Sequence, residues 1–319
     1  MIVRPHRTAP FLLAAVLSVV SLGAAALWAA EAKAPARPDP EAYRKEIEAF
    51  RKERFDSLKK EDGWLTLVGL YWLKPGENRF GSDPGNPVIL PKGKAPAVAG
   101  LLIREGDKVR VTVEPGVALT ADGKAVAPGS PGIELGKDTD GTPTLLELGS
   151  LNFYVIKRGD RLGVRIKDKA SPVLASFKGL DSYPIRPEWR IVARFEPYKD
   201  KKIAIANIVG QVDDNPSPGA VVFDWQGKTY RIDALEGSPE GGLFLLFGDK
   251  TNGKETYGAG RFLDTDPPKD GKVVVDFNTA YNPPCAFTAF ATCPLPPAQN
   301  KLAVAIEAGE KNFAGGPHH

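Results

Sequence analysis

From Gly63 onward the sequence consists of short runs of alternating apolar residues, each interrupted by glycine, proline or aspartate. Residues 109–113 and 162–166 alternate strictly, with valine, leucine or isoleucine at every second position. Similar runs lie at residues 189–195, 202–208, 220–223, 242–247, 272–277 and 302–306. A period of two is typical of strands that bury one face, and 33 glycines with 29 prolines exclude a helical bundle. The sequence therefore predicts a mainly β fold of sandwich or barrel-like architecture.

Residues 41–62 are the one segment with a clear helical pattern. Apolar residues recur there at three- and four-residue spacing from Tyr43 to Leu58, with charges between them. Asp39 is placed to cap this helix, with Pro40 at its first position. We expect an amphipathic helix that packs one stripe on the body of the protein, with a partner-binding helix as the alternative.

The first 30 residues have the features of an export segment. Arg4 and Arg7 precede an uncharged stretch over residues 11–30 that ends in small residues, which predicts a signal peptide and an exported, periplasmic or secreted protein. The stretch is longer than a typical signal core, so an uncleaved membrane anchor is the alternative. Residues 31–40 are rich in proline and predict a stiff spacer. A membrane is expected as a partner only through such an uncleaved leader.

Histidine is absent between His6 and His318. This absence excludes a Ser-His-Asp triad, a Cys-His dyad and a histidine-ligated metal inside the fold. Residues 1–30 hold two of the 42 basic residues and no acidic one, so the remaining chain has 40 basic and 39 acidic residues. Without a basic stripe interleaved with aromatic residues, we expect no nucleic-acid partner. Dinucleotide, phosphate-loop and complete calcium-loop motifs are also missing, so we expect no organic cofactor and no metal.

Residues 77–91 resemble the opening of a forkhead-associated domain, with a Gly-Ser-Asp-Pro loop before an Ile-Leu strand. The resemblance implies a β-sandwich over residues 63–170. That family binds phosphothreonine through an arginine after the glycine, but Ser82 stands at this position, and Asp122 and Gly123 stand where the family has Asn-Gly. A pocket without its arginine and with an added carboxylate would repel a phosphate, so the resemblance implies the fold and not the binding.

Two further segments resemble the bacterial family known as domain of unknown function 1684. They are residues 63–73, with the sequence GWLTLVGLYWL, and residues 249–311, with motifs such as YNPPC, ATCPLPP and GEK. The resemblance covers roughly residues 40–311 and implies no established activity. We expect residues 171–311 to form a second β-rich half that carries the functional site, followed by a tail over residues 312–319.

Several types of polar side chain are predicted to meet where the strand over residues 272–277 ends. Asp276 and Asn278 lie two positions apart and so face the same way on a strand. Arg261 follows two glycines that permit close approach of the backbone. Such groups suit a polar or anionic small molecule, of unknown identity, as the ligand. The residues expected to bind it are Tyr257, Asn278, Tyr281, Asn282 and Cys285.

If the site is catalytic, a hydrolase is the expected class, with Arg261 as the anion clamp and Asp276 or Glu255 as the acid or base. A pair of these two carboxylates would work without histidine. The structural alternative is an ion pair between Asp276 and Arg261 that supports the proline-rich loop. The functional alternative is a non-catalytic envelope binding or scaffold protein that uses the sandwich half as its interaction surface.

Cys285 and Cys293 are the two cysteines of the chain, and each is next to a proline. In an exported protein an even number of cysteines predicts a disulfide bond, here closing a short loop. The alternative is a reactive thiolate at Cys285, activated by Arg261.

Overall fold

The structure is a computed structural model and describes residues 39–129 and 131–316. Helix α1 (Pro40–Leu58) begins after Asp39, whose carboxylate accepts hydrogen bonds from the backbone N–H groups of Glu41 and Ala42. One stripe of the helix, which includes Tyr43, Ile47 and Leu58, is buried. The helix ends at Leu58, four residues before the predicted end, and turns lead into the first strand.

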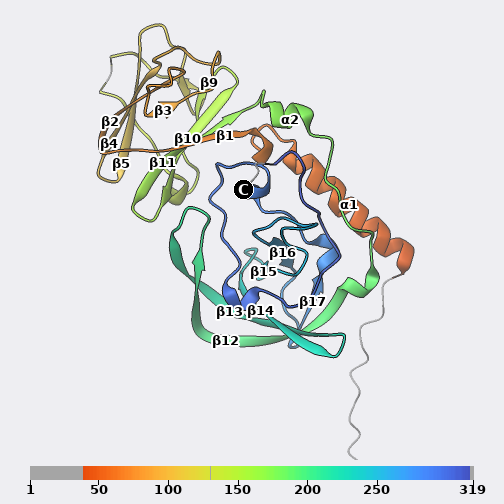
Figure 1. Cartoon of the computed structure of the whole chain (residues 1–319). Helices are drawn as coiled ribbons and strands as arrows, with labels where there is room; N and C mark the ends of the chain where they lie inside the picture. Colours follow the sequence, from red (N-terminus) through yellow and green to blue (C-terminus); the bar gives the residue numbers. More distant parts are fainter. Residues whose placement is uncertain (1–38, 130, 317–319) are drawn as a thin grey trace, which may run out of the picture. The chain divides into compact units, whose positions relative to one another are not determined.

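Two mainly antiparallel sheets enclose the first core (Figure 1). One contains β1 (Leu67–Trp72), β11 (Arg161–Asp168), β10 (Leu151–Arg158), β9 (Leu146–Leu148), β6 (Thr120–Ala121) and β7 (Lys124–Ala125), in that order. The other contains β3 (Val88–Ile89), β2 (Gly76–Gly81), β4 (Gly100–Glu105), β5 (Lys108–Val113) and β8 (Ile133–Glu134). Alternate residues of both sheets, such as Leu102, Val111 and Val164, fill the space between them.

A third sheet forms most of the second half of the chain. Its order is β16 (Arg261–Thr265), β15 (Leu243–Phe247), β14 (Lys228–Glu236), β13 (Val212–Trp225), β12 (Arg190–Ala206) and β17 (Lys272–Asp276), and all pairs are antiparallel. Four aromatic rings meet within its otherwise aliphatic core, where Phe277 contacts Trp189, Phe223 and Phe247 edge-on or tilted. The mainly β fold that the alternating runs predict is confirmed.

The remaining helical segments are short. They are α2 (Pro172–Ser176) and single 3-10 turns at Trp64–Thr66, Asp138–Asp140, Pro187–Trp189, Phe277–Thr279, Pro284–Ala286 and Ala298–Asn300. A third apolar cluster joins α1 and α2 to the C-terminal loops, where Phe177 packs against Phe55 and Phe313. The described residues therefore form one compact unit with three apolar clusters.

The strand predicted at residues 302–306 is wrong. Leu302, Val304 and Ile306 are buried at every second position as expected, but the segment lies outside every sheet of the described residues. Part of its backbone bonds to side chains instead, since Ile306 receives a hydrogen bond from Arg261 and donates one to Asp249. Alternation reports which face is buried, and here that face is held without a neighbouring strand.

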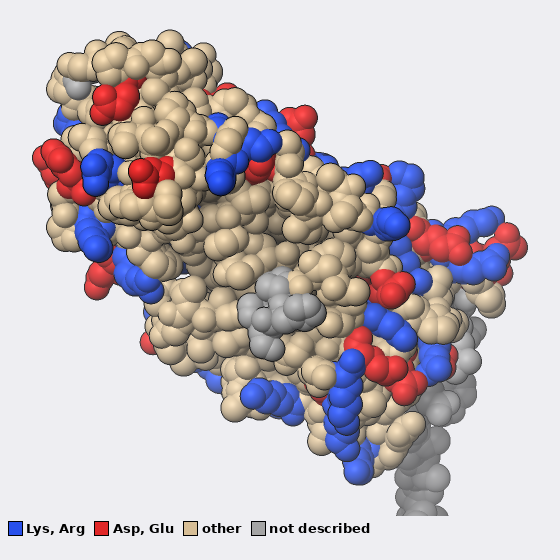
Figure 2. Space-filling model, turned by 45° about the horizontal axis from the view of Figure 1, so that its top comes forward, with Lys and Arg blue, Asp and Glu red and all other residues tan. Residues whose placement is uncertain are grey.

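Within residues 39–129 and 131–316, no helix has both the length and the apolar character needed to cross a membrane. The predicted leader and most of the predicted spacer lie outside the described residues. On the face shown in Figure 2, basic and acidic side chains are interspersed with uncharged surface.

Candidate functional site

Arg261, the predicted anion clamp, is completely buried at the start of β16. Its Nη2 atom lies 2.8 Å from Oδ2 of Asp249 and also 2.8 Å from the carbonyl oxygen of Ile306. Its Nη1 atom donates to the carbonyl groups of Ala308 and Glu310. The guanidinium thus ties the C-terminal segment to the third sheet, and its ionic partner is Asp249 instead of the predicted Asp276.

Asp276 and Asn278 fasten helix α1 to the end of β17. The Tyr43 hydroxyl donates to the Asp276 carboxylate at 2.8–2.9 Å, and Asn278 Nδ2 donates to the same hydroxyl oxygen at 2.9 Å. Asn278 also exchanges hydrogen bonds with the backbone of Arg186. Burial, with the adjacent carboxylate, raises the pKa of the Tyr43 phenol, so the phenol remains a neutral donor to Asp276.

Glu255 and Tyr257 have partners of their own. The Glu255 carboxylate accepts a hydrogen bond of 2.6 Å from the Tyr183 hydroxyl, while Tyr257 is buried in the third apolar cluster. Glu255 and Asp276, the predicted carboxylate pair, therefore each accept from a different tyrosine. The structure distributes the predicted catalytic residues among three separate hydrogen-bonded groups.

Tyr281 and Asn282 lie next to the buried carboxylate of Glu310, which is not among the predicted site residues. The backbone N–H of Asn282 donates to Glu310 Oε2 at 2.7 Å, and its side-chain amide donates to the carbonyl of Lys311. The Tyr281 ring lies under the guanidinium of Arg54, 4.9 Å from it. These two predicted residues thus contact a charged group that involves helix α1.

A disulfide bond joins Cys285 to Cys293, with the Cα atoms 6.2 Å apart. The part of the chain that the structure describes contains no free cysteine. The bond closes the loop next to Asn282, and both cysteines are buried in the third apolar cluster. This geometry matches the structural interpretation of the cysteines and leaves no thiol for the nucleophile alternative.

A cavity of about 340 Å3 opens between helix α1 and residues 179–182. Arg51, Lys52, Arg54 and Phe55 line it from the helix, and Glu310 lines it from the C-terminal segment. Arg54 Nε lies 3.0 Å from Glu310 Oε1, and Arg54 Nη2 donates to the carbonyl of Asn282. The Arg54–Glu310 ion pair is therefore part of the cavity wall, and the fully buried Arg261 lies behind it with a contact to the Glu310 backbone.

The electrostatics of this cavity are unusual for a protein surface. Burial raises the pKa of the Glu310 carboxyl, although Arg54, the Asn282 amide and Arg261 oppose the shift. Burial also lowers the pKa of the Arg51 guanidinium, against the attraction of Glu310. Arg51 Nη2 donates to the carbonyl of Tyr183, whereas its buried Nε has no acceptor among the described residues. Perturbed titratable groups around a cavity are a frequent sign of a functional site.

The sequence contains only weak signals for these residues. Glu310 belongs to the GEK motif quoted above, yet nothing in that motif indicates burial. Arg51 and Arg54 follow Ile47 by four and seven positions, so they lie on the same stripe of the helix as the buried residues, and helical periodicity is the signal that could have found them. Their charge favours a solvated side chain instead, and that Glu310 is the group they face depends on how the helix packs, which periodicity and capping patterns do not report.

The fold and the site together define a mainly β protein whose helix α1 supplies arginines to a buried carboxylate. Residues 175–311 match the model of a family described as "Protein of unknown function (DUF1684)". The match includes Asn282 and Glu310. It covers the second half of the chain and not the whole of the expected residues 40–311.

The chain is also similar to an uncharacterised protein of Haloarcula marismortui whose solution NMR structure is known. The two are 29% identical over 43% of this chain and 78% of that one, with a TM-score of 0.37. No curated protein matches the chain.

Proposed function

We propose that this protein binds a small anionic molecule, one carrying a carboxylate or phosphate group, in the cavity between helix α1 and residues 179–182. The observation that carries the proposal is the Arg51 guanidinium, which lines the cavity with a buried Nε donor that no described residue satisfies. A buried donor without an acceptor costs free energy. An anionic oxygen in the cavity would provide the acceptor and would neutralise the charge of Arg51.

The neighbouring charges favour the same class of ligand. Lys52 and Arg54 add two cations to the cavity wall, while Glu310 and Asp181 add two carboxylates. The Glu310 carboxylate is already paired with Arg54. Arg51 is therefore the cation of the cavity whose charge is balanced least by carboxylates of the protein. The volume of about 340 Å3 accommodates a molecule of roughly citrate size.

Calorimetric titration of the purified protein with inorganic phosphate and with citrate, in a chloride-free buffer, tests this proposal. Arg51→Gln should weaken binding of the better anion by about tenfold. Arg44→Gln, which removes the same charge from an exposed position two turns earlier on α1, should leave the affinity nearly unchanged. Equal losses in both variants, or binding of glycerol as tight as that of citrate, would contradict a specific anion site.

Hydrolysis is the candidate reaction at this site because Glu310 is a cavity-lining carboxyl with a raised pKa, the property of a general acid. In this proposal Glu310 takes the acid role first assigned to Asp276 and Glu255. Turnover of p-nitrophenyl acetate or p-nitrophenyl phosphate should fall sharply in Glu310→Gln and persist in Glu307→Gln. Equal turnover in the two variants would remove the hydrolase and leave the binding function.

The non-catalytic alternative is an envelope binding or scaffold protein with a forkhead-associated-like sandwich. It is supported by the bonds that occupy Arg261, Asp276 and Glu255. In the sandwich, the Ser82 hydroxyl donates to the carbonyl of Ala95, so this hydroxyl already has a hydrogen-bond partner within the protein. Export through the N-terminal leader is part of both proposals, and mass spectrometry of protein from the cell envelope would locate the mature N-terminus.

A further inference from the structure

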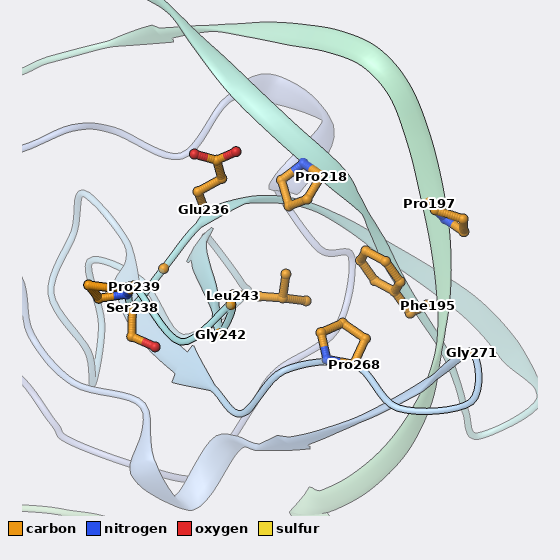
Figure 3. A pocket seen from close by; sticks show the side chains of 12 residues that line it. Phe195, Pro197, Pro218, Glu236, Ser238, Pro239, Gly242, Leu243, Pro268 and Gly271 are labelled. Atoms are coloured by element: carbon orange, nitrogen blue, oxygen red, sulfur yellow. The ribbon is translucent and has the colours of Figure 1, made fainter.

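A second cavity, of about 720 Å3, lies at the end of the third sheet where the β14–β15 connection meets β12, β13 and the loop before β17. Figure 3 shows the side chains of Leu243, Phe195 and Pro268 facing one another around it, with Glu236 at its margin. Its walls are mainly apolar, and its polar side chains are Glu236 and Ser238. This cavity is formed by residues different from those of the arginine site.

Proline makes the walls of this cavity stiff. Pro197, Pro218, Pro239 and Pro268 come from four different parts of the chain and all line it. Each proline has a fixed φ angle, so the walls lose little conformational entropy when a ligand binds. A preformed apolar cavity of this size is suited to a small hydrophobic group.

Glu236 also lines a neighbouring cavity of about 430 Å3 that is much more polar. Glu236 pairs with Leu243 across the β14–β15 ladder, and Leu243 lines the apolar cavity while the next residue, Phe244, lines the polar one. The base of this hairpin therefore separates an apolar compartment from a polar compartment, with a carboxylate common to both.

The charges of the polar cavity are unbalanced. Its lining includes the carboxylates of two exposed residues, Glu236 and Asp213, and neither carboxylate forms a hydrogen bond or ion pair with any residue in the described ranges. Arg158 is its one lining cation, and the Arg158 guanidinium already donates to Asp138 at 2.6 Å and to Thr292. A cationic group is the complement of this arrangement.

We propose that the paired cavities bind an amphipathic amine, with its apolar chain against Leu243 and Phe195 and its ammonium group at Glu236 on the side of Asp213. The proposal assigns a second ligand site, of opposite charge preference to the arginine site, and does not depend on it. A small molecule suits this site because the apolar compartment is bounded on several sides by elements of this one chain.

Titration with n-octylamine, n-octanol and n-octanoate tests the assignment on the full-length protein, with calorimetric detection. The amine should bind most tightly, and its affinity should rise about fourfold for each methylene added from n-butylamine to n-octylamine. Glu236→Gln should weaken n-octylamine binding about fivefold without affecting n-octanol. Glu240→Gln, at an exposed carboxylate of the same connection that does not line the cavity, should behave as wild type.

A second matched pair tests the polar compartment. Asp213→Asn should weaken n-octylamine binding, whereas Asp214→Asn, at the next and non-lining position of β13, should not. Arg51→Gln should leave n-octylamine binding intact, which separates this site from the proposed anion site. The proposal is overturned if n-octanoate binds as well as n-octylamine, if chain length has no effect, or if the Glu236 and Glu240 variants are indistinguishable. Concentration-dependent dimerisation that Glu236→Gln abolishes would also overturn it, since it would assign this face to a second copy of the chain.

Discussion

The Nη2 atom of Arg261 lies 2.8 Å from Oδ2 of Asp249, and both side chains are completely buried. Two charges in such a place repay their desolvation only when nearly all their polar atoms are bonded. The two Nη atoms of Arg261 are bonded to Asp249 and to carbonyl groups of residues 306–310, whereas its buried Nε has no acceptor among the described residues. Asp249 also accepts from Thr251 and the Ile306 amide. The pair therefore organises the backbone of the segment that carries Glu310.

Arg261→Ala should destabilise the protein by about 3–5 kcal/mol, because it leaves Asp249 as an uncompensated buried charge. Urea denaturation followed by tryptophan fluorescence measures the loss. Arg194→Ala removes an arginine from an exposed ion pair with Glu196 and should cost less than about 1 kcal/mol. Similar losses in both variants would show that the buried pair has no special structural role.

The stability of the protein should fall as pH rises through the titration of Glu310. The pKa of this carboxyl is raised in the folded protein, so the folded state holds the proton more tightly than the unfolded chain, whose pKa is about 4.3. The free energy of unfolding therefore decreases from about pH 4.3 upward until the raised pKa is passed, and the cost is constant above it.

Glu310→Gln removes this titration. The difference in free energy of unfolding, variant minus wild type, should increase over the same pH window and then level off. Urea denaturation at intervals between pH 4 and pH 8 measures it, with Glu307→Gln, at a carboxylate that is 47% exposed, as the matched control. Parallel curves for wild type and Glu310→Gln would contradict the predicted role of burial.

Both cysteines should resist alkylation until the protein is unfolded and reduced. Intact mass after iodoacetamide treatment measures this, and the informative comparison is protein unfolded in guanidinium with and without reductant. Labelling in the unreduced, unfolded sample would mean free thiols that are merely buried. Reduction should lower the free energy of unfolding by about 2–3 kcal/mol, as expected for closure of a short loop.

Gly260→Ala should be strongly destabilising, whereas Gly258→Ala should be tolerated. Gly260 has a φ of +105°, and a Cβ there would lie 2.6 Å from Pro296 and 2.7 Å from the carbonyl oxygen of Phe247. A Cβ at Gly258 would approach nothing closer than 3.8 Å. We expect a loss of about 1–3 kcal/mol at position 260, measured by thermal or urea unfolding. Equal stability of the two variants would contradict the close packing of β16 against the proline-rich loop.

Features that depend on neighbours along the chain were predictable. Asp39 and Pro40 mark the start of α1 because capping is a local interaction. Alternation located strands such as β5 and β11 because each strand has one buried face. The same signal failed at residues 302–306, where the buried face is real but the backbone bonds partly to the chain after β15, at Gly248 and Lys250, and partly to the side chains of Arg261 and Asp249.

The sequence by itself determined the fold class, the single long helix and the residue types available for chemistry. Only the tertiary structure decided which of those residues meet. It paired Arg261 with Asp249, placed Asp276 under Tyr43, and brought Arg54 to Glu310 from 256 positions earlier in the chain. Periodicity and capping report local geometry and the direction of burial, whereas the partner of a buried charge is set by how distant elements pack. That packing is the sum of many weak contacts that no short motif encodes.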